Sequence, residues 1–471
     1  GNYSLPIDMR NCKVMKFGGT SVGDASRIGR VAEIVSEYAD YSQIVVVSAM
    51  SGTTDRLVQA YAKARAGENW REEFEAIESG HYAALDQLGG RGSDRDRVRV
   101  TIADILSELR QRLESIPAGA AMSHQQSDAI VSFGERLSVR LVAFCLNTRG
   151  IAAQPVEATD LIVTTADFGD AEPLLELTER RSKFRLEQLL RQGITPIVTG
   201  FIGSTMHGET TTLGRGGSDY TATIIGYCVD AEEVIIWTDV PGVMTTDPRV
   251  VSDARTIQSL SYDEAADLSH FGAKVLHPLT MVPASLKNTP IRIKNSFRVD
   301  APGTLITDSI IDASQTVKAI TPKKDLTLIS ITDTRRNVLE VLAQVSAALT
   351  DCGITPYLLT HASAIGSVSV VVDMAKREEL VKAIESKGEL ENVRSDGDVS
   401  IVAIVGSGIY SIPGLYARAF TALSGSGVKF LAIASDASQR SLSIAIRSDD
   451  TYVAIRSLHQ GLQLIKTEEE S

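Results

Sequence analysis

Cys12-Lys-Val-Met-Lys-Phe-Gly-Gly-Thr-Ser-Val-Gly23 joins an apolar run to a pair of glycines. The run predicts a buried strand, and Asp24 is placed to cap a helix that continues to about Tyr38. Glycines between a strand and a helix let backbone N–H groups approach phosphate oxygens, and Lys16 adds a positive charge. The lysine precedes the glycines, so this is not the GxxxxGK[ST] loop, and an ordinary tight turn explains a lone glycine pair equally well.

The chain that follows this stretch repeats the same order of elements. Buried-type strands are predicted at residues 44–48, 194–199 and 233–237, each followed by small or polar residues. Residues 55–118 read as helices with a polar interruption at 89–96, and one further helix is expected over 127–145. Alternation of this kind indicates an α/β fold, with a largely parallel central sheet between helices and a ligand site at the carboxyl ends of the strands.

A second glycine-rich loop is Thr210-Thr-Thr-Leu-Gly-Arg-Gly-Gly-Ser-Asp-Tyr220. Arg215 can hold a carboxylate or a phosphate through two parallel hydrogen bonds. Ser218 and Asp219 fall at the start of the helix that follows. Asp219 can contact a ligand or can simply cap that helix, and the two roles are compatible.

Two further segments complete the set of motifs, and the first of them follows an apolar strand. Trp237-Thr-Asp-Val-Pro-Gly-Val-Met-Thr-Thr-Asp-Pro-Arg249 is rich in turn residues, and Phe271-Gly-Ala-Lys-Val-Leu-His-Pro278 places Lys274 among apolar neighbours. Those neighbours disfavour a simply solvated lysine. A histidine before a proline, as at His277, is more typical of a turn than of a metal site, and the HExxH pattern is absent.

The character of the chain changes after Ala301-Pro-Gly-Thr304. Two β-α-β-like segments then recur at an offset of 74 residues. Residues 328–331 correspond to 402–405, Gly353 to Gly427, and 367–370 to 441–444. Accidental similarity is the alternative, but the ungapped register favours a paired small module that follows a domain of about 300 residues.

Composition excludes several classes of partner. The 471 residues include 47 Lys and Arg against 59 Asp and Glu, a formal net charge of −12. An acidic chain has no general attraction to nucleic acid or to anionic lipid, so neither is expected as a partner. No apolar run approaches 18 residues, so no membrane span is expected. The four cysteines form no CxxC pair, which favours a reducing, cytoplasmic setting over a zinc site or a disulfide framework.

The ordered set KFGGTSV, VVVSAMSGTTDRL, SFGERLS, VTGFIG, TTLGRGGSDYTA, WTDVPGVMTTDPRVV and FGAKVLHP resembles the aspartate kinases of the amino-acid kinase family. The repeated segments resemble the tandem ACT domains of those enzymes, in which the first unit is inserted into the second, so a strand at 317–320 would belong with the final domain. The resemblance implies an amino-acid kinase fold followed by two ferredoxin-like βαββαβ ACT domains. The implied boundaries are an N-terminal extension at 1–12, a catalytic domain at 13–306, a linker with the first strand of the second ACT domain at 307–322, the first ACT domain at 323–395 and the second at 396–471.

The resemblance also implies roles for individual residues. Nucleotide binding is implied for Lys16, Gly18, Gly19, Thr20, Ser21, Thr238, Asp239, Met244, Arg249, Lys274 and Val275. Aspartate binding is implied for Ser48, Thr54, Glu135, Phe201, Arg215, Ser218 and Asp219. The catalytic set is Lys16, Arg215, Asp219 and Lys274, and no protein metal ligand is implied. Arg215 suits the α-carboxylate of aspartate, Glu135 and Asp219 suit its ammonium group, and the two lysines would neutralise charge on the transferred phosphoryl group.

The implied reaction converts ATP and L-aspartate into ADP and 4-phospho-L-aspartate, at the entry to lysine, threonine and methionine biosynthesis. The nucleophile is a carboxylate whose ordinary pKa is about 3.9, so no general base is needed to create it. Catalysis then depends on alignment and on electrostatic stabilisation of charge. Mg²⁺ is expected as the cofactor, held mainly by ATP phosphates and water.

The sequence departs from the family pattern at several positions. Met244 stands where many relatives carry tyrosine. The effector loops read Thr360-His-Ala-Ser-Ala364 and Ala434-Ser-Asp-Ala-Ser438, without the glutamines associated with threonine sensing, and Tyr357 replaces an acidic group of lysine-sensing relatives. An amino-acid effector at the ACT domains is therefore expected without a defined identity, and the ACT domains imply a homodimer or a dimer of dimers.

Three alternatives bear on the activity. A catalytically silent amino-acid sensor would use only the ACT pair, but Lys16, Arg215, Asp219 and Lys274 are all retained. Another acyl-phosphate kinase, such as one that uses glutamate, is disfavoured by the tandem C-terminal units and by SFGERLS. Some relatives also carry a homoserine dehydrogenase domain, which is not expected here because no dinucleotide fingerprint is present.

Overall fold

The computed structural model describes residues 11–308, 317–435, 440–462 and 464. The chain forms two compact units, one from Gly1–Gly242 with Leu276–Asp308 and the other from Val243–Val275 with Ser309–Ser471. Apart from Asn11 and Cys12, the expected N-terminal extension lies outside the described residues. Parts of the expected segments 307–322 and 396–471 lie outside them as well.

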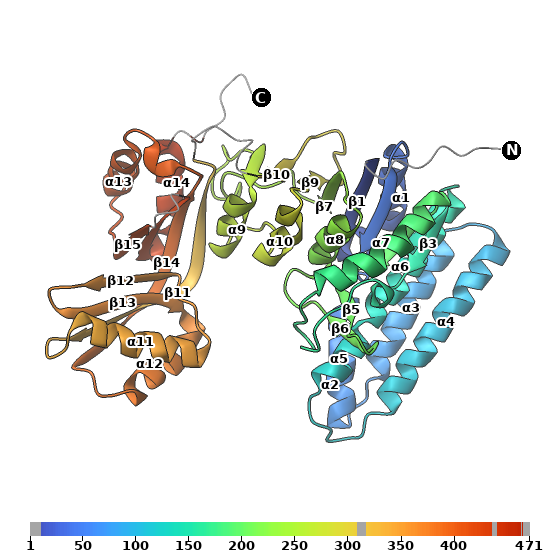
Figure 1. Cartoon of the computed structure of the whole chain (residues 1–471), viewed down its shortest axis with the longest axis horizontal. Helices are drawn as coiled ribbons and strands as arrows, with labels where there is room; N and C mark the ends of the chain where they lie inside the picture. Colours follow the sequence, from blue (N-terminus) through green and yellow to red (C-terminus); the bar gives the residue numbers. More distant parts are fainter. Residues whose placement is uncertain (1–10, 309–316, 436–439, 463, 465–471) are drawn as a thin grey trace. The chain divides into compact units, whose positions relative to one another are not determined.

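The first unit is built on a mostly parallel sheet (Figure 1). Those of its strands that belong to the first unit follow the spatial order β3 (Ala153–Val156), β4 (Thr195–Thr199), β2 (Ser42–Val47), β1 (Cys12–Phe17), β7 (Glu233–Thr238), β9 (Ile291–Asn295) and β10 (Thr304–Thr307). Neighbours from β3 to β9 are parallel, and β10 is antiparallel to β9. The central strands are buried on both faces, which explains their continuous apolar runs.

Helices cover both faces of this sheet. One face packs against α1 (Ala25–Glu37) and α6 (Phe133–Thr148), and the other against α7 (Leu175–Arg191), α8 (Gly217–Cys228) and α10 (Pro278–Leu286). Helices α2 (Thr53–Ala66), α3 (Arg71–Gln87), α4 (Gly92–Glu114) and α5 (His124–Val131) extend the first layer. A hairpin of β5 (Ile202–Ser204) and β6 (Thr210–Thr212) stands apart from the sheet.

Two helix predictions are corrected and one is confirmed. Asp24 caps α1, because its side chain accepts a hydrogen bond from the backbone N–H of Arg27. The single helix expected over 127–145 is two helices, since Ser132 separates α5 from α6 and its hydroxyl bonds the carbonyl of Ala129, a local bond that competes with helical continuation. The interruption expected over 89–96 is shorter, because α4 already begins at Gly92.

The strand register brings the ends of four strands to one edge. Phe17 lies beside both Val47 and Trp237, and Val47 lies beside Thr199. These strands are parallel, so the residues that follow them leave the sheet at the same edge. This edge is where a ligand site is expected in an open α/β sheet.

The second unit contains an antiparallel sheet in the order β12 (Leu358–Ala362), β13 (Gly366–Asp373), β11 (Ala319–Asp333), β14 (Asn392–Val405), β16 (Ser441–Arg447) and β15 (Ala432–Ser435). Its helices are α11 (Val338–Cys352), α12 (Arg377–Ser386), α13 (Leu415–Gly425) and α14 (Thr451–Gly461). Strands β11 and β14 serve both repeats. The first five residues of β11 pair with the end of β14, and its remainder pairs with β13. The expected boundaries after residues 322 and 395 therefore fall inside continuous strands.

The offset of 74 holds for most of the repeat and is wrong for its first strand. Val368 and Val370 face the core of the first repeat, and Leu442 and Ile444 face the core of the second. In the first strand, however, the core residue Ile329 is matched by Val402, an offset of 73. Side chains alternate between the two faces of a strand. Alignment at an offset of 74 would therefore match the core residues of one repeat with residues on the opposite face in the other.

Residues 243–275 pack within the second unit. This segment contains β8 (Ser259–Ser261) and α9 (Tyr262–His270). The backbone N–H of Ile320 donates to the carbonyl of Thr245 at 2.9 Å, and the N–H of Ser407 donates to Glu264 Oε2 at 2.8 Å. The segment was expected within the catalytic stretch 13–306, and in the structure it makes these contacts with the repeats.

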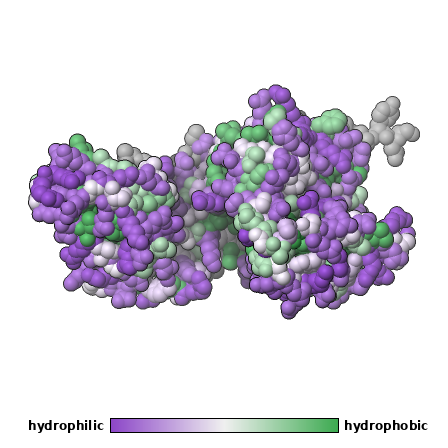
Figure 2. Space-filling view, turned by 90° about the horizontal axis from the view of Figure 1, so that it is seen from below, coloured by the Kyte–Doolittle hydropathy of each residue, from purple (hydrophilic) through white to green (hydrophobic). Residues whose placement is uncertain are grey.

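Figure 2 shows hydrophilic residues over most of the visible surface, interrupted by small apolar areas. In the part of the chain that the structure describes, none of the helices has both the length and the apolar character needed to cross a membrane. The four cysteines are free thiols, and Cys12, Cys145 and Cys228 are buried.

Candidate active site

The first glycine-rich loop lies at the end of β1. Lys16 is the penultimate residue of that strand, and Gly19 begins a short 3₁₀ turn that ends at Val22. A Cβ atom at Gly19 would lie 2.9 Å from the carbonyl oxygen of Ala49, so only glycine fits here. Helix α1 begins at Ala25. The 3₁₀ turn therefore stands between the glycines and the helix that Asp24 caps.

An ion pair joins the two glycine-rich loops. Lys16 Nζ lies 2.9 Å from Asp219 Oδ1, and both side chains remain partly exposed. Asp219 lies in the first turn of α8, whose N-cap is Gly216 with φ 82° and no side-chain cap. The alternative that Asp219 caps this helix is therefore wrong, and its carboxylate is directed to Lys16.

A second contact between the ends of two elements involves serines. Ser48, which directly follows β2, donates its hydroxyl to Ser218 Oγ at 2.8 Å. Ser218 lies in the first turn of α8, beside Asp219. The structure thus brings together four of the predicted residues, namely Lys16, Ser48, Ser218 and Asp219.

Glu135 lies in the first turn of α6 and is only 3% exposed. Its Oε1 accepts a hydrogen bond from the backbone N–H of Ala49 at 3.3 Å. Its Oε2 has no hydrogen-bond partner among the described residues. Burial raises the pKa of this carboxyl to about 8. A buried acid with an unpaired oxygen is suited to a cationic ligand group.

Phe201 has an unusual backbone conformation, and the side chain of Arg215 has no partner among the described residues. Phe201 has φ 74°, which is strained for a bulky residue. Its backbone N–H donates to Thr221 Oγ1 at 2.8 Å, and its carbonyl accepts from the N–H of Leu213 at 2.9 Å. Arg215 is exposed, and its guanidinium forms no hydrogen bond or ion pair with any described residue. Thr54, in the first turn of α2, is half-buried.

The remaining predicted nucleotide residues of the first unit flank β1 and β7. Thr20 is exposed, and its carbonyl accepts a hydrogen bond from Arg27 Nη1 at 2.9 Å. The N–H of Ser21 donates to the carbonyl of Gly18 at 3.1 Å. Thr238 ends β7, its hydroxyl contacts the backbone of Val240, and Asp239 beyond it is exposed.

Four predicted nucleotide residues belong to the second unit. Met244 Sδ lies 3.5 Å from Thr256 Oγ1, and Arg249 pairs with Asp247 at 2.8 Å. Hydrogen bonds from Arg249 hold the pKa of Asp247 below its usual value. Val275 is half-buried. Lys274 is exposed, so the expectation that its neighbours disfavour solvation is wrong, because the turn after α9 directs it outward.

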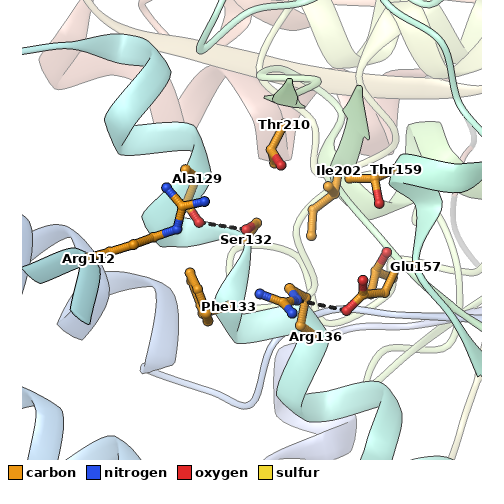
Figure 3. Close-up of a pocket in the computed structure, with 10 residues that line it drawn as sticks. Arg112, Ala129, Ser132, Phe133, Arg136, Glu157, Thr159, Ile202 and Thr210 are labelled. Carbon is orange, nitrogen blue, oxygen red and sulfur yellow. Dashed lines mark hydrogen bonds and ion pairs between the residues drawn. The ribbon is translucent and has the colours of Figure 1, made fainter. Parts of the chain in front are cut away.

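Neither of two cavities in the first unit is lined by a predicted site residue. The smaller, of about 90 Å³, is drawn in Figure 3 beside the start of α6. Of its charged residues Arg112, Arg136 and Glu157, the last two pair with each other at 2.7 Å, and it has room for only a few waters. The larger, of about 940 Å³, lies between α4 and α6 and is lined by Arg91, Arg97 and Arg140.

Two residues of the site region were missed. Asp128 is buried and accepts hydrogen bonds from Thr212 and Gly169. Thr212 lies inside a motif that had been singled out, but no role had been assigned to it. The available signal for Asp128 was a charged residue in the apolar stretch that precedes Phe133.

The described residues contain no cluster of three or more His, Cys, Asp or Glu side chains that could hold a metal ion. This is compatible with an ion that arrives on the phosphates of a nucleotide, because Mg²⁺ usually takes one or two protein carboxylates and keeps several waters.

Comparisons with known proteins agree with this architecture. Residues 11–295 match the model of the Amino acid kinase family, and residues 402–462 match an ACT domain. Aspartokinase 3, chloroplastic, of Arabidopsis thaliana is 34% identical over 462 residues, which cover 95% of this chain and 81% of that protein.

Two solved structures of E. coli aspartokinase III are similar over 96% of this chain. The complex with aspartate and ADP, in the R-state, has a TM-score of 0.80, 32% identity and 100% coverage of that chain. The complex with lysine and aspartate, in the T-state, has a TM-score of 0.79, 31% identity and 99% coverage. The chain therefore belongs to the amino acid kinase family, among the aspartokinases with C-terminal ACT domains.

Proposed function

We propose that this chain transfers the γ-phosphoryl group of ATP to the side-chain carboxylate of L-aspartate. The observation that carries the proposal is the junction of the two glycine-rich loops through Lys16 and Asp219, beside the contact of Ser48 with Ser218. This junction lies at the carboxyl edge of the parallel sheet. The similarity to an aspartokinase that binds aspartate and ADP supports both substrates.

The amino acid is recognised through its two charged ends. Arg215, which has no partner of its own among the described residues, binds the α-carboxylate through paired hydrogen bonds. Glu135 accepts the ammonium group on its unpaired Oε2. Ser48, Thr54, Phe201 and Ser218 border the amino acid and complete its orientation.

The chemical step needs no general base. One oxygen of the aspartate side chain forms a bond to the γ-phosphorus, the bond from that phosphorus to the β,γ-bridging oxygen breaks, and ADP leaves. Two anions must approach each other, so positive charge and alignment supply the catalysis. Lys16 provides that charge in the first unit, and Asp219 holds the lysine at the junction of the two loops.

The nucleotide is proposed to contact Gly18, Gly19, Thr20, Ser21, Thr238 and Asp239 in the first unit, and Met244, Arg249, Lys274 and Val275 in the second. Lys274 supports the transfer through its charge. Mg²⁺, bound to the phosphates, would neutralise part of their charge.

We also propose that the second unit takes part in regulation and assembly. An amino-acid effector binds the ACT repeats, and L-lysine is the first to test, because the similar E. coli enzyme was solved with lysine. The ring centroids of Tyr357 and His270 are 5.2 Å apart, and Tyr357 offers no carboxylate for a lysine ammonium group. The test therefore also includes other amino acids. Calorimetry with each amino acid identifies the effector, and absence of heat from all of them leaves the repeats a role in assembly.

The proposed assembly is a homodimer or a dimer of dimers. Strands β12 and β15 end the sheet of the second unit and are each paired on one side only within the described chain. Leu359 and Ile433 on these strands are 37% and 40% exposed. Terminal strands with exposed apolar residues are natural places for contact between subunits. Sedimentation velocity measures the assembly directly.

The proposal also includes a biosynthetic pathway and a cellular location. The product, an acyl phosphate of aspartate, would feed the synthesis of lysine, threonine and methionine. The cytoplasm is the proposed location, supported by four free thiols, which suit a reducing compartment.

The activity is tested by ADP release from Mg²⁺-ATP with L-aspartate, with L-glutamate and with no amino acid. Hydroxylamine in the assay converts an acyl phosphate into a hydroxamate. The expected result is ADP release and hydroxamate formation that depend on aspartate. Release with glutamate alone would assign a different acceptor, and no amino-acid-dependent release would indicate a silent sensor.

A further inference from the structure

A buried carboxylate on the helix before Glu135 is hydrogen-bonded to the strand that leads to Arg215. Asp128 is on α5 and is 3% exposed. No lysine or arginine forms an ion pair with it in the described part of the chain, and burial raises its pKa above the usual value. An isolated buried carboxylate is costly unless its oxygens are well satisfied.

Three backbone or hydroxyl donors satisfy this carboxylate. Asp128 Oδ2 accepts from the N–H of Gly169 at 2.8 Å and from the N–H of Thr212 at 3.1 Å. Asp128 Oδ1 accepts from the Thr212 hydroxyl at 2.8 Å. The carboxylate therefore holds two segments that are distant in sequence, the loop at Gly169 and the end of β6.

The segments held by Asp128 lead directly to Arg215. Thr212 is the last residue of β6 and precedes Arg215 by three positions. Its carbonyl accepts from the N–H of Ala171 at 3.0 Å, so its donors and its acceptor are all fixed. A Cβ atom at Gly214 would lie 2.6 Å from Asp170 Oδ1. The loop at Gly169 is therefore in close contact with the loop that carries Arg215.

The helix that carries Asp128 leads to Glu135. Helix α5 ends at Val131, and α6 begins two residues later with Glu135 in its first turn. Figure 3 shows Ala129 of α5 and Thr210 of β6 on the walls of the small cavity. Asp128 bridges these same two elements.

We propose that Asp128 is a positioning residue for the amino-acid substrate, which holds the Arg215 loop against the helix pair that carries Glu135. It acts through Thr212 and Gly169 and does not contact the substrate. This inference rests on the proposed function, because it takes Arg215 and Glu135 as the groups that bind the two ends of aspartate.

The test uses paired variants of the full chain. Thr212→Val removes only the hydroxyl contact with Asp128. Thr211→Val is the matched control, because Thr211 is the adjacent buried threonine of the same strand and its hydroxyl contacts Thr164 at 2.7 Å instead. Asp128→Ala removes all three contacts. Asp128→Asn can retain them, because its oxygen accepts both N–H groups while its amide donates to the Thr212 hydroxyl.

The expected result is a rise in aspartate KM of several-fold in Thr212→Val and more in Asp128→Ala. ATP KM should be unchanged, and Asp128→Asn and Thr211→Val should stay near the parent value. In the Arg215→Ala background, Thr212→Val should add little, because both changes disturb the same contact. If Asp128→Ala does not fold, the comparison of Thr212→Val with Thr211→Val remains decisive.

Contrary outcomes separate the inference from the proposed function. Equal aspartate KM in Thr212→Val and Thr211→Val, with a large rise in Arg215→Ala, overturns the positioning role alone. A full additional effect of Thr212→Val in the Arg215→Ala background also overturns it. No aspartate-dependent turnover in the parent chain, or an unchanged aspartate KM in Arg215→Ala, overturns the site assignment itself.

Discussion

The two compact units use particular polar side chains differently. In the first unit, Glu135 keeps an unpaired oxygen and Arg215 keeps an unpaired guanidinium among the described residues, so both are available to a ligand. In the second unit, Thr245, Glu264 and His459 are buried in contacts that hold residues 243–275 against the repeats. This difference fits the proposal that the first unit recognises the amino acid, while the second supports a segment proposed to contact the nucleotide.

The repeats of the second unit are also unequal. His459 in α14 is fully buried, and its Nε2 lies 3.0 Å from Thr245 Oγ1. The equivalent position of the first repeat, at an offset of 74, is Glu385 in α12, which is exposed. At this position the second repeat therefore contacts residues 243–275, and the first repeat does not.

The largest effect should come from the charge at the junction of the two loops. Lys16→Ala should lower kcat by about 10²- to 10³-fold, a typical cost of losing one stabilising group for transition-state charge, with little change in aspartate KM. Lys13→Ala is the matched control in the same strand, because Lys13 pairs with Glu233 at 2.9 Å. Steady-state kinetics compares the two variants, and a near-normal kcat in Lys16→Ala would remove Lys16 from the catalytic set.

The next effect should fall on the amino acid alone. Arg215→Ala should raise aspartate KM by about 10- to 100-fold, since charged hydrogen bonds contribute about 1.5–3 kcal/mol. The exposed Arg180 of α7, which pairs with Glu176, gives a control of the same chemistry. A change in ATP KM with a constant aspartate KM would make Arg215 a nucleotide residue.

A pH effect should follow from the buried acid of the first unit. Burial raises the pKa of Glu135 to about 8, so the unliganded protein carries this proton at neutral pH. An ammonium group favours the ionised carboxylate, so aspartate binding should release a proton and aspartate KM should fall as pH rises toward 8, by up to about tenfold per pH unit. Calorimetry in two buffers of different ionisation enthalpy measures the release, and Glu135→Gln should abolish it. Proton uptake on binding would contradict this role.

The smallest effect should arise in the second unit. His459→Leu removes a buried hydrogen bond to Thr245, and a typical loss of about 0.5–1.5 kcal/mol would raise ATP KM by about 2- to 10-fold through the segment that carries Arg249 and Lys274. Glu385→Leu, at the matched position of the first repeat, should leave ATP KM unchanged. An equal change in ATP KM in the two variants would show that the two repeats do not differ in this role.

Much of the fold was predictable from local patterns. The strand that ends at Phe17, the cap at Asp24 and the parallel order of strands follow from apolar runs and turn residues. Two errors have different causes. The break at Ser132 is local, because its hydroxyl bonds the carbonyl of Ala129 three residues earlier. The one-residue shift between Ile329 and Val402 depends on packing within each repeat, which a repeat offset does not report.

The site was predictable where a motif combines charge with glycine. Lys16 and Asp219 were each singled out in such a motif, but the ion pair that joins them was not predicted. The contribution of Asp128 could not be predicted, because it acts through hydrogen bonds to a distant loop rather than through a motif. The packing of residues 243–275 with the repeats was missed for the same reason.

The most direct test measures the two KM values side by side in the Arg215→Ala and His459→Leu variants. The account predicts that Arg215→Ala raises aspartate KM and leaves ATP KM near the parent value, while His459→Leu does the reverse. Parallel changes of both KM values in both variants would contradict the division of recognition between the two units.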